Sequence, residues 1–448
     1  MLSAKKIGSL IAMVVMLAAL VMIGYFIQRT QFVTFIILSA LCFGSYILLL
    51  TNSAFSLKQL LYFGLVCRAI FIFSIPVLSD DYFRFLWDGH LVNMGINPFL
   101  ALPSSLMIDQ AIRDNSTMQF LYNHMNSQYY FSVYPSIMQA CFALSTWLFP
   151  ASIKSPVIIL HFIMTLAELG TCIYGIKILR LLRLSEKNIL WYALNPLVII
   201  ELAGNLHFEA VMIFFCTASF FYLLEKKPVF AAMFISLAIA TKLLPVICIP
   251  FFFKYLEKEH RLQFFFGTII YTTILFIPFL NPVFFEHLLT SVALYFHSFE
   301  FNGSIYKVVR WIGYEVTGNN IIWVAGVVLP CIVLMSIFIL YSRQVKNDET
   351  SLLKCLLFSF TIYLAMASIV HPWYVTMLVF LNIYLDYKFV YLWSATILLS
   401  YFTYSQIPYQ ESGWLSALEY LPVFGLMIYE FRNKRPFLKF RKHVEPHL

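Results

Sequence analysis

Apolar runs recur along the whole chain, and short polar segments separate them. Most of the runs are about 17 to 25 residues long, which is the length that an α-helix needs to cross a bilayer. They do not alternate between polar and apolar positions, as the strands of a membrane barrel would. The pattern therefore predicts an all-α polytopic membrane protein with about 12 to 14 transmembrane helices. The runs cover residues 8–27, 31–50, 60–78, 134–150, 156–176, 189–203, 207–224, 229–253, 264–280, 321–341, 352–370, 374–385, 389–403 and 415–429.

Residues that break helices interrupt some of these runs. The runs 189–203 and 207–224 are hinged at Gly204-Asn205, and the run 229–253 contains Thr241-Lys242 and Pro245. We expect the latter run to form two half-helices that meet within the membrane. Broken helices in a membrane are tolerated where they line protein or a water-filled cavity. Lys242 therefore marks a predicted cavity.

The composition excludes a soluble globular protein. The chain has 448 residues, of which 61% are hydrophobic and 12% charged, whereas roughly a quarter of a soluble domain is charged. The net charge of +8 comes from basic residues at the ends of apolar runs and in the segment 432–442, which indicates cytoplasmic anchoring and no nucleic-acid partner. The eight cysteines lie almost entirely in apolar runs without a Cys-x-x-Cys motif, so we expect core residues and not disulfides or a metal site.

The charge pattern also predicts a topology. We expect one integral membrane domain over 1–448, with an outer catalytic loop at 79–132, a second outer loop at 281–319 and a basic cytoplasmic tail at 432–448. The basic segment 177–187 does not fit, because counting the spans places it outside. Either one run between 134 and 176 does not cross the membrane, or the charge bias is overridden; the sequence leaves both open.

The first outer loop begins with a concentration of charge. Asp80, Asp81, Arg84 and Asp88 lie within nine residues. The spacing places the last three on one face of a helix, and Asp80 can cap its first turn. Trp87 on the same helix favours the headgroup level, which predicts a helix that lies flat on the membrane. The alternative interpretation is a capped, solvated loop helix without a function.

Further polar residues are expected at the same outer rim. Together they supply a general base, cations for a phosphate and aromatic surfaces for a sugar ring. Arg68 lies inside an apolar run and should face protein or a wet cavity, where it could snorkel, pair structurally or have a functional role. Glu168 lies in a later run, where it could be a protonated or paired structural group. The residues expected at the rim are Asp80, Asp81, Arg84, Asp88, Asn97, Tyr134, Asn302, His371 and Trp373, with His207, Glu209 and Lys242 as further candidates.

The motif Asp-Asp-x-x-Arg-x-x-Trp-Asp-Gly at 80–89, completed by Gly95-x-Asn97-Pro98, carries a resemblance. It resembles the first outer loop of the polyprenyl-phosphate-sugar-dependent glycosyltransferases of the GT-C fold. The most similar branch contains bacterial alpha-mannosyltransferases and the first mannosyltransferase of glycosylphosphatidylinositol synthesis. The resemblance covers roughly residues 60 to 385. Further matching motifs are Tyr134-Pro135, Asn195-Pro196 with Gly204-Asn205-x-His207, Ala240-Thr241-Lys242-x-x-Pro245, Phe301-Asn302-Gly303-Ser304 and His371-Pro372-Trp373-Tyr374.

Two departures from the family pattern stand out. The acidic residue after the middle histidine is usually Asp, whereas here it is Glu209, two positions after His207. Two additional spans also precede the catalytic loop, which in the minimal fold usually follows the first helix.

The resemblance implies an inverting transfer of a sugar, expected to be mannose, from a polyprenyl-phosphate donor to a hydroxyl of a lipid-linked or glycan acceptor. It implies Asp81 as the general base, because that aspartate stands three residues before Arg84, and Asp80 is the reserve choice. Lys242 and Arg310 are candidate phosphate cations, and snorkelled or solvated charges are the alternative. The expected substrate-binding residues are Arg84, Asp88, Asn97, Tyr134, His207, Lys242, Asn302, Arg310, His371, Trp373 and Tyr374.

We expect no tightly bound cofactor and no protein-held metal, although adjacent aspartates can bind Mg2+ or Mn2+ together with substrate phosphates. The sequence contains no Gly-rich phosphate loop, so it gives no support for nucleotide binding. The expected location is a bacterial plasma membrane, among membrane lipids, with the site facing the periplasm or exterior. The alternative function is a transporter or flippase of a lipid-linked sugar, which would use the same broken helices; a structural partner in an envelope complex is a third.

Overall fold

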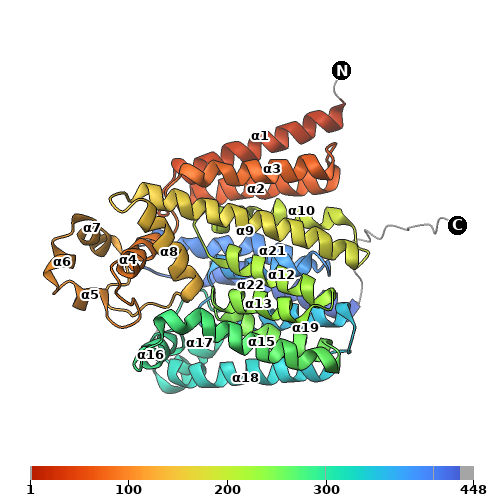
Figure 1. The fold of residues 1–448 in the computed structure, drawn as a ribbon. Helices are drawn as coiled ribbons and strands as arrows, with labels where there is room; N and C mark the ends of the chain where they lie inside the picture. The colour runs from red at the N-terminus through yellow and green to blue at the C-terminus, as the bar shows by residue number, and fades with distance from the viewer. Residues whose placement is uncertain (1–2, 298, 407, 434–448) are drawn as a thin grey trace.

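The computed structural model describes residues 3–297, 299–406 and 408–433, and their regular elements are helices (Figure 1). Within these ranges the only bridges are isolated ones that join Phe301 and Asn302 to Ile369. Six helices are long and apolar enough to cross a membrane, and a bent pair, Pro196–Gly204 with Glu209–Leu224, would make a seventh. The six are α1 (Ala4–Tyr25), α2 (Phe32–Asn52), α9 (Lys154–Leu181), α15 (Lys258–Phe276) with its extension to Phe279, α18 (Ile322–Arg343) and α19 (Glu349–Met366).

The predicted all-α polytopic membrane fold is therefore confirmed, but against the expected 12 to 14 transmembrane helices only six, or seven with the bent pair, have the length and composition of a span in the described ranges. Several expected spans consist of shorter pieces, because proline and polar residues end the helices. The run 229–253, for example, forms α13 (Pro228–Ile239), a 3-10 turn (Leu244–Ile247) and α14 (Cys248–Tyr255). The other α-helices are α3 (Leu57–Ala69), α4 (Asp81–Asn93), α5 (Pro103–Leu106), α6 (Gln110–Arg113), α7 (Ser116–His124), α8 (Ser136–Leu148), α10 (Leu190–Ala193), α11 (Pro196–Val198), α12 (Glu209–Leu224), α16 (Phe284–His297), α17 (Ile305–Thr317), α20 (Thr376–Asn382), α21 (Lys388–Thr396) and α22 (Gly413–Asn433). Further 3-10 helices cover Ile70–Phe73, Glu186–Ile189, Ile277–Phe279, Pro372–Val375 and Ile397–Ser405, and a π-helix covers Ile199–Gly204.

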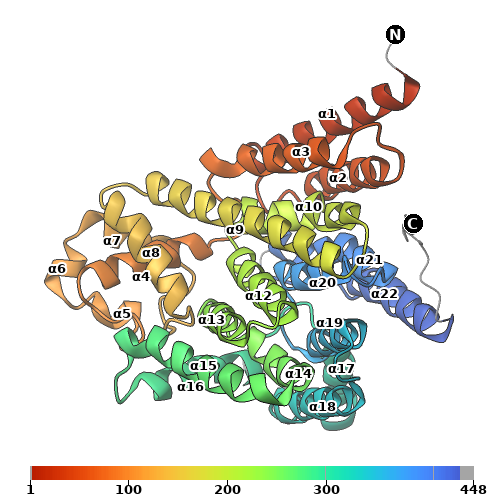
Figure 2. The same cartoon turned by 45° about the vertical axis from the view of Figure 1, so that its right-hand side comes forward.

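Helix α8 resolves the question of topology that the sequence left open. It has 13 residues, which gives a length of about 20 Å, whereas the hydrocarbon core is about 30 Å thick. It packs against α4, beside the other helices of the outer loop (Figure 2). Helix α9, with 28 residues, runs from this region to the end of the bundle where the chain begins (Figure 1). The first alternative therefore holds: α8 does not cross, and the basic segment 177–187 lies at the same end as the N-terminus.

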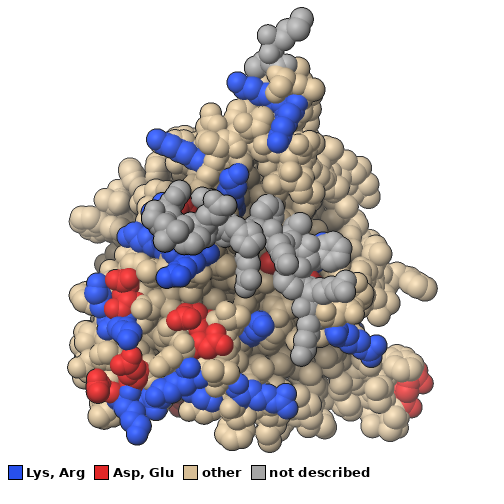
Figure 3. Space-filling view, turned by 90° about the vertical axis from the view of Figure 1, so that its right-hand side faces the viewer, with Lys and Arg blue, Asp and Glu red and all other residues tan. Residues whose placement is uncertain are grey.

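Basic side chains are spread over that end of the bundle (Figure 3). Lys226, in the α12–α13 turn, pairs with Glu257 at 2.8 Å, and Lys254 Nζ donates to the carbonyl of Tyr341 at 2.5 Å. These contacts join three turns that carry basic residues. The positive-inside rule associates such a face with the cytoplasm.

Helix α4 is enclosed by other helices of the outer loop, so most of its aromatic side chains are buried in protein. It packs against α7 and α8, and Trp87 is fully buried. Gly89 permits the close contact with α8, because a Cβ at this position would come within 2.5 Å of the Phe142 carbonyl oxygen. The helix is therefore held in place by packing, and its first turn has a defined position.

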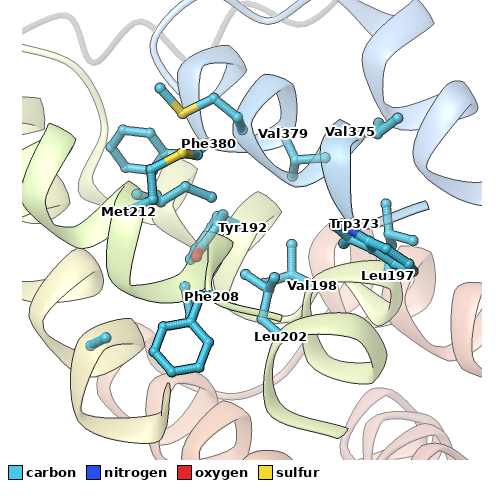
Figure 4. Close-up of a cluster of buried hydrophobic side chains, with 14 of the residues drawn as sticks. Tyr192, Leu197, Val198, Leu202, Phe208, Met212, Trp373, Val375, Val379 and Phe380 are labelled. Atoms are coloured by element: carbon cyan, nitrogen blue, oxygen red, sulfur yellow. The ribbon is translucent and has the colours of Figure 1, made fainter. Parts of the chain in front are cut away.

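Two buried features support the region behind the outer loop. Arg68 of α3 forms an ion pair with Glu168 of α9, and Arg68 Nη1 also donates to the carbonyls of Gly64 at 2.9 Å and Ala193 at 2.7 Å. The structural pairing that the sequence left open is thus present. An apolar cluster lies around the bend before α12, where the chain turns by 113°. Figure 4 shows its side chains, among them Leu197, Val198, Leu202, Phe208, Met212, Trp373, Val379 and Phe380.

Candidate functional site

A cavity of about 380 Å³ lies where the outer loop meets the bent and broken helices. The first turn of α4, the start of α12 and the loop after α13 each contribute charged side chains to its wall. The segment after α19 contributes aromatic ones. The polar and aromatic lining residues are Arg29, Ser79, Asp80, Asp81, Asn126, Tyr134, Glu209, Lys242, Tyr363, His371, Trp373, Tyr374 and Tyr404.

Four of the five Asp, Glu, Lys and Arg side chains that line this cavity in the described chain form ion pairs. Arg29 Nη1 lies 2.5 Å from Asp80 Oδ2, and Lys242 Nζ lies 2.5 Å from Glu209 Oε1. The carboxylate of Asp81 is the fifth, and within the described residues it has neither an ion pair nor a hydrogen bond. Its backbone N–H donates to Ser79 Oγ at 3.3 Å, which fixes the start of α4. Asp81 is therefore held by the backbone while its carboxylate faces the cavity unpaired.

Burial raises the pKa of Asp81 to about 6. The nearby charge of Lys242 lowers the pKa, whereas the charges of Asp80 and Glu209 raise it. Desolvation disfavours the charged form of a carboxyl group and so makes its anion a stronger base. At neutral pH Asp81 is thus mostly ionised and more basic than an ordinary aspartate, which suits a group that must accept a proton.

Four aromatic rings form a continuous stack beside the cavity. The ring of Trp373 lies between His207, at a centroid distance of 3.5 Å, and His371, at 4.3 Å. Phe301 covers the other side of His371 at 4.6 Å. Burial, and to a lesser extent the charge of Lys242, lowers the pKa of His371 to about 3. His371 is therefore neutral near pH 7, and its Nδ1 has no hydrogen-bond partner among the residues that the structure describes.

A second cavity, of about 370 Å³, shares Asp81 and His371 with the first. Glu300 lies in its wall together with Arg84, Ser127 and Tyr130. Burial by itself would raise the pKa of Glu300, but hydrogen bonds from Tyr306 and Asn320 and the charge of Arg310 lower it below its ordinary value. Asp81 thus stands where two polar cavities meet, so two different molecules could approach its carboxylate.

Comparison with known families identifies the class of protein that contains these cavities. Residues 3–257, more than half of the chain, match the model of the alpha-(1->6)-mannopyranosyltransferase N-terminal domain. The chain belongs to this mannosyltransferase family. A search of curated proteins found no match. The protein is therefore a glycosyltransferase of the mannose-transferring, GT-C type, and the match to a family of enzymes does not favour the transporter interpretation.

The stretch that matches the family model contains the charged residues of the first cavity, among them Asp81, Glu209 and Lys242, and it ends before His371. The structure thus brings residues from both inside and outside the matched stretch to one site. Of the residues that the sequence predicted as site residues, those in the wall of the first cavity are Asp80, Asp81, Tyr134, Lys242, His371, Trp373 and Tyr374. Arg84 lines the second cavity, and His207 stacks behind Trp373.

The other predicted site residues of the mannosyltransferase fasten loops. Asp88 is fully buried and accepts from Arg84 Nε at 2.7 Å, Ser132 Oγ at 2.5 Å and Gln139 Nε2 at 3.0 Å. Asn97 Nδ2 donates to the carbonyl of Phe279 at 2.9 Å. These bonds tie the outer loop to α8 and to the end of α15. Neither residue lines the two cavities.

Asn302 and Arg310 also lie outside the walls of both cavities. Asn302 Nδ2 donates to Glu419 of α22 at 3.0 Å, and the hydroxyl of Tyr420 donates to the Asn302 carbonyl at 2.5 Å. Arg310 pairs with Glu300. In the described structure these residues place the segment that carries Phe301, whose ring covers His371.

The structure corrects one local expectation and adds two residues. Asp80 occupies the N-cap position of α4, but its side chain makes no capping hydrogen bond because it accepts from Arg29. Sequence reasoning missed Arg29, which stands alone in a short loop between two apolar runs. It also left Glu209 in doubt because Glu209 departs from the family pattern, although the cavity contains it.

The carboxylates of the site do not form a cage for a metal ion. Asp80 and Glu209 are each paired with a cation. Over the described ranges, no group of three or more His, Cys, Asp or Glu side chains is arranged to hold a metal ion.

Proposed function

We propose that the enzyme transfers mannose from a polyprenyl-phosphate donor to a hydroxyl of a lipid-linked or glycan acceptor, with inversion, and that Asp81 is the general base. One observation carries this proposal: Asp81 is the charged group of the cavity that no ion pair occupies, and it shares that cavity with Lys242 and His371. Asp80, the reserve choice, is engaged by Arg29.

The proposed step moves one proton and one glycosyl group. The acceptor oxygen attacks the anomeric carbon of mannose from the face opposite the phosphate, and its proton passes to the Asp81 carboxylate. The bond between the anomeric carbon and the phosphate oxygen breaks, and the electron pair leaves with the polyprenyl phosphate. A hydroxyl is a poor nucleophile until its proton is removed, so a base within hydrogen-bond reach accelerates the step by roughly 100- to 10,000-fold.

Charge on the leaving phosphate assigns a role to Lys242. The phosphate gains negative charge as the bond breaks, and a cation aimed at it stabilises the transition state. Lys242 lies at the apex between α13 and α14, 26% of its side chain is exposed, and its ammonium lies 5.7 Å from the centre of the Tyr374 ring. His371, as a neutral ring, is suited to hydrogen-bond the sugar or the phosphate through its unpaired Nδ1.

The proposed setting is a bacterial plasma membrane, with the cavity on the face opposite the basic end of the bundle and so toward the periplasm or exterior. The second cavity would then admit the acceptor to Asp81 while the first holds the donor. An aqueous approach suits a glycan acceptor, because polar side chains such as Glu300 and Arg84 line this second cavity.

The test is reconstitution of the purified enzyme in liposomes with polyprenyl-phosphate mannose and a panel of acceptor lipids and glycans. Asp81→Asn should lower turnover by about 100-fold or more, while the protein keeps its melting temperature. Asp109→Asn is the matched control, because Asp109 caps a helix elsewhere in the same loop and Asn caps helices equally well. If Asp81→Asn keeps full turnover, the assignment of the base is wrong.

A further inference from the structure

Arg29 enters the cavity from a part of the chain that the other site residues do not use. It lies in the short loop between α1 and α2, which form a helical pair at one side of the bundle (Figure 2). The other charged residues of the cavity wall come from the α4 region, α12 and the loop after α13. The helical pair thus delivers one cation to the site.

The contacts of Arg29 leave part of its guanidinium free to bind an anion. Nη1 donates to Asp80, whereas Nη2 makes only a long contact with the hydroxyl of Tyr409, at 3.4 Å. The guanidinium carbon lies 5.7 Å from the centre of the Tyr404 ring, and 28% of the side chain is exposed. Ion pairs that are exposed to this extent contribute little stability, so a competing anion can displace one partner.

The charge balance of the cavity favours such a displacement. Three carboxylates and two cations line the described cavity, so its net charge is negative when all three carboxylates are ionised. A phosphodiester entering this cavity is repelled unless a cation turns from its carboxylate to the phosphate. An arginine suits this role because its planar fork of N–H groups matches two phosphate oxygens.

We propose that Arg29 binds the phosphate of the lipid donor by exchanging its partner Asp80 for a phosphate oxygen. The inference rests on the proposed function, because it takes the donor to be a polyprenyl phosphate. Exchange leaves the carboxylate of Asp80 without its cation, next to Asp81. A like charge nearby favours the protonated form of Asp81, so arrival of the donor makes the catalytic carboxylate a stronger base.

Binding of polyprenyl phosphate, the sugar-free product, tests the proposal without turnover. The protein carries Asp81→Asn and is held in lipid nanodiscs. Arg29→Gln should weaken binding by roughly 10- to 100-fold, the range for loss of a charge-assisted hydrogen bond, and Arg29→Lys should restore part of it. Asp80→Asn should tighten binding, because Arg29 no longer has a competing partner. Arg113→Gln, which changes an exposed cation elsewhere in the outer loop, is the control and should bind as the Asp81→Asn parent protein does.

Two results would overturn the proposal. If Arg29→Gln binds polyprenyl phosphate as tightly as the Asp81→Asn parent protein, Arg29 does not touch the phosphate. If Arg29→Gln and Asp80→Asn weaken binding equally, and the double variant is no worse, the pair is only a structural brace. Inorganic phosphate and phosphatidylglycerol serve as competitors: displacement by either at the concentration of the prenyl ligand would show a general anion site and also count against a donor site.

Failure of this proposal is distinguishable from failure of the proposed function. Binding is measured in the Asp81→Asn background, so it does not depend on which group is the base. Loss of turnover in Asp81→Asn together with unchanged binding in Arg29→Gln would retain the proposed function and reject the role of Arg29.

Discussion

The pH dependence of transfer tests the proposed base directly. Burial raises the pKa of Asp81 to about 6, and the charges of Asp80 and Glu209 raise it while that of Lys242 lowers it. The base must be ionised to accept a proton. The value of kcat/KM should therefore be constant above the pKa and fall as the pH decreases through it.

The expected size of the decrease follows from the pKa. With a pKa of about 6, the fraction of ionised Asp81 is about 90% at pH 7 and about 9% at pH 5, so kcat/KM should fall about tenfold between these values. An aspartate with its ordinary pKa of 3.8 would remain roughly 94% ionised at pH 5, and the rate would hardly change. His371, with a pKa of about 3, does not titrate in this range.

Substitution of Lys242 and of Asp80 should move the acidic limb of the pH profile of kcat/KM in opposite directions. Lys242→Met removes a charge that lowers the pKa of Asp81, so the limb should shift to higher pH. Asp80→Asn removes a charge that raises the pKa, so the limb should shift to lower pH. The assay measures initial rates at limiting donor from pH 4.5 to 8, with the melting temperature recorded at each pH. A limb that stays in place in both variants would show that another group titrates, and the assignment of Asp81 would be refuted.

Three further predictions concern the frame of the site. Arg68→Leu or Glu168→Leu alone should destabilise the protein by about 3 to 5 kcal/mol, and the double variant by less, because only the single variants leave a buried charge unpaired; melting in detergent measures this. Asp88→Asn should lower both melting temperature and turnover, because Arg84 loses its ion-pair partner. Arg84 also donates to the carbonyls of Ser127 and Tyr130 at 2.9 and 3.0 Å and so holds the outer loop. Unchanged values would show that the loop is held by packing alone. Gly89→Ala should destabilise by about 1 to 3 kcal/mol, because its Cβ meets backbone, and Gly44→Ala, in open space, is the neutral control.

The sequence predicted the centre of the site because that part depends on local pattern. The adjacent aspartates, the broken run around Lys242 and the segment His371-Pro372-Trp373-Tyr374 are each visible as departures from an apolar run. All of them lie in the wall of one cavity. A polar group inside an apolar run is costly unless it faces protein or water, so its presence already indicates a buried polar contact or a cavity.

Residues that act through distant partners could not be assigned in this way. Asn97 and Asn302 were expected to bind substrate because they are polar and belong to matching motifs. Their side chains instead bond to Phe279, 182 residues away, and to Glu419, 117 residues away. No local pattern shows whether an amide near the rim fastens a loop or faces the cavity. The length of α8 was similarly ambiguous, because hydropathy does not distinguish a short buried helix from the start of a span.

Arg29 was missed for a related reason: one cation between two apolar runs resembles an ordinary flanking charge. Its ion-pair partner, Asp80, lies 51 residues away in the sequence. A single unpaired positive charge on the outer side, where cations are few, was nevertheless a signal that could have been used. The positive-inside bias makes an outer arginine unusual enough to ask what it binds.

The consecutive aspartates owe their different roles to the start of α4. Successive residues on a helix project about 100° apart, so Asp80 at the cap position meets Arg29 while Asp81 in the first turn faces the cavity. The helix N-terminus favours the ionised form of Asp81, whereas burial and the charges of Asp80 and Glu209 oppose it. Two identical groups therefore separate into a paired carboxylate and an unpaired one, which is the proposed base; pairs of catalytic carboxylates achieve such a division through their surroundings. If Arg29 paired with Asp81 instead of Asp80, the proposed base would be lost even though both aspartates remained.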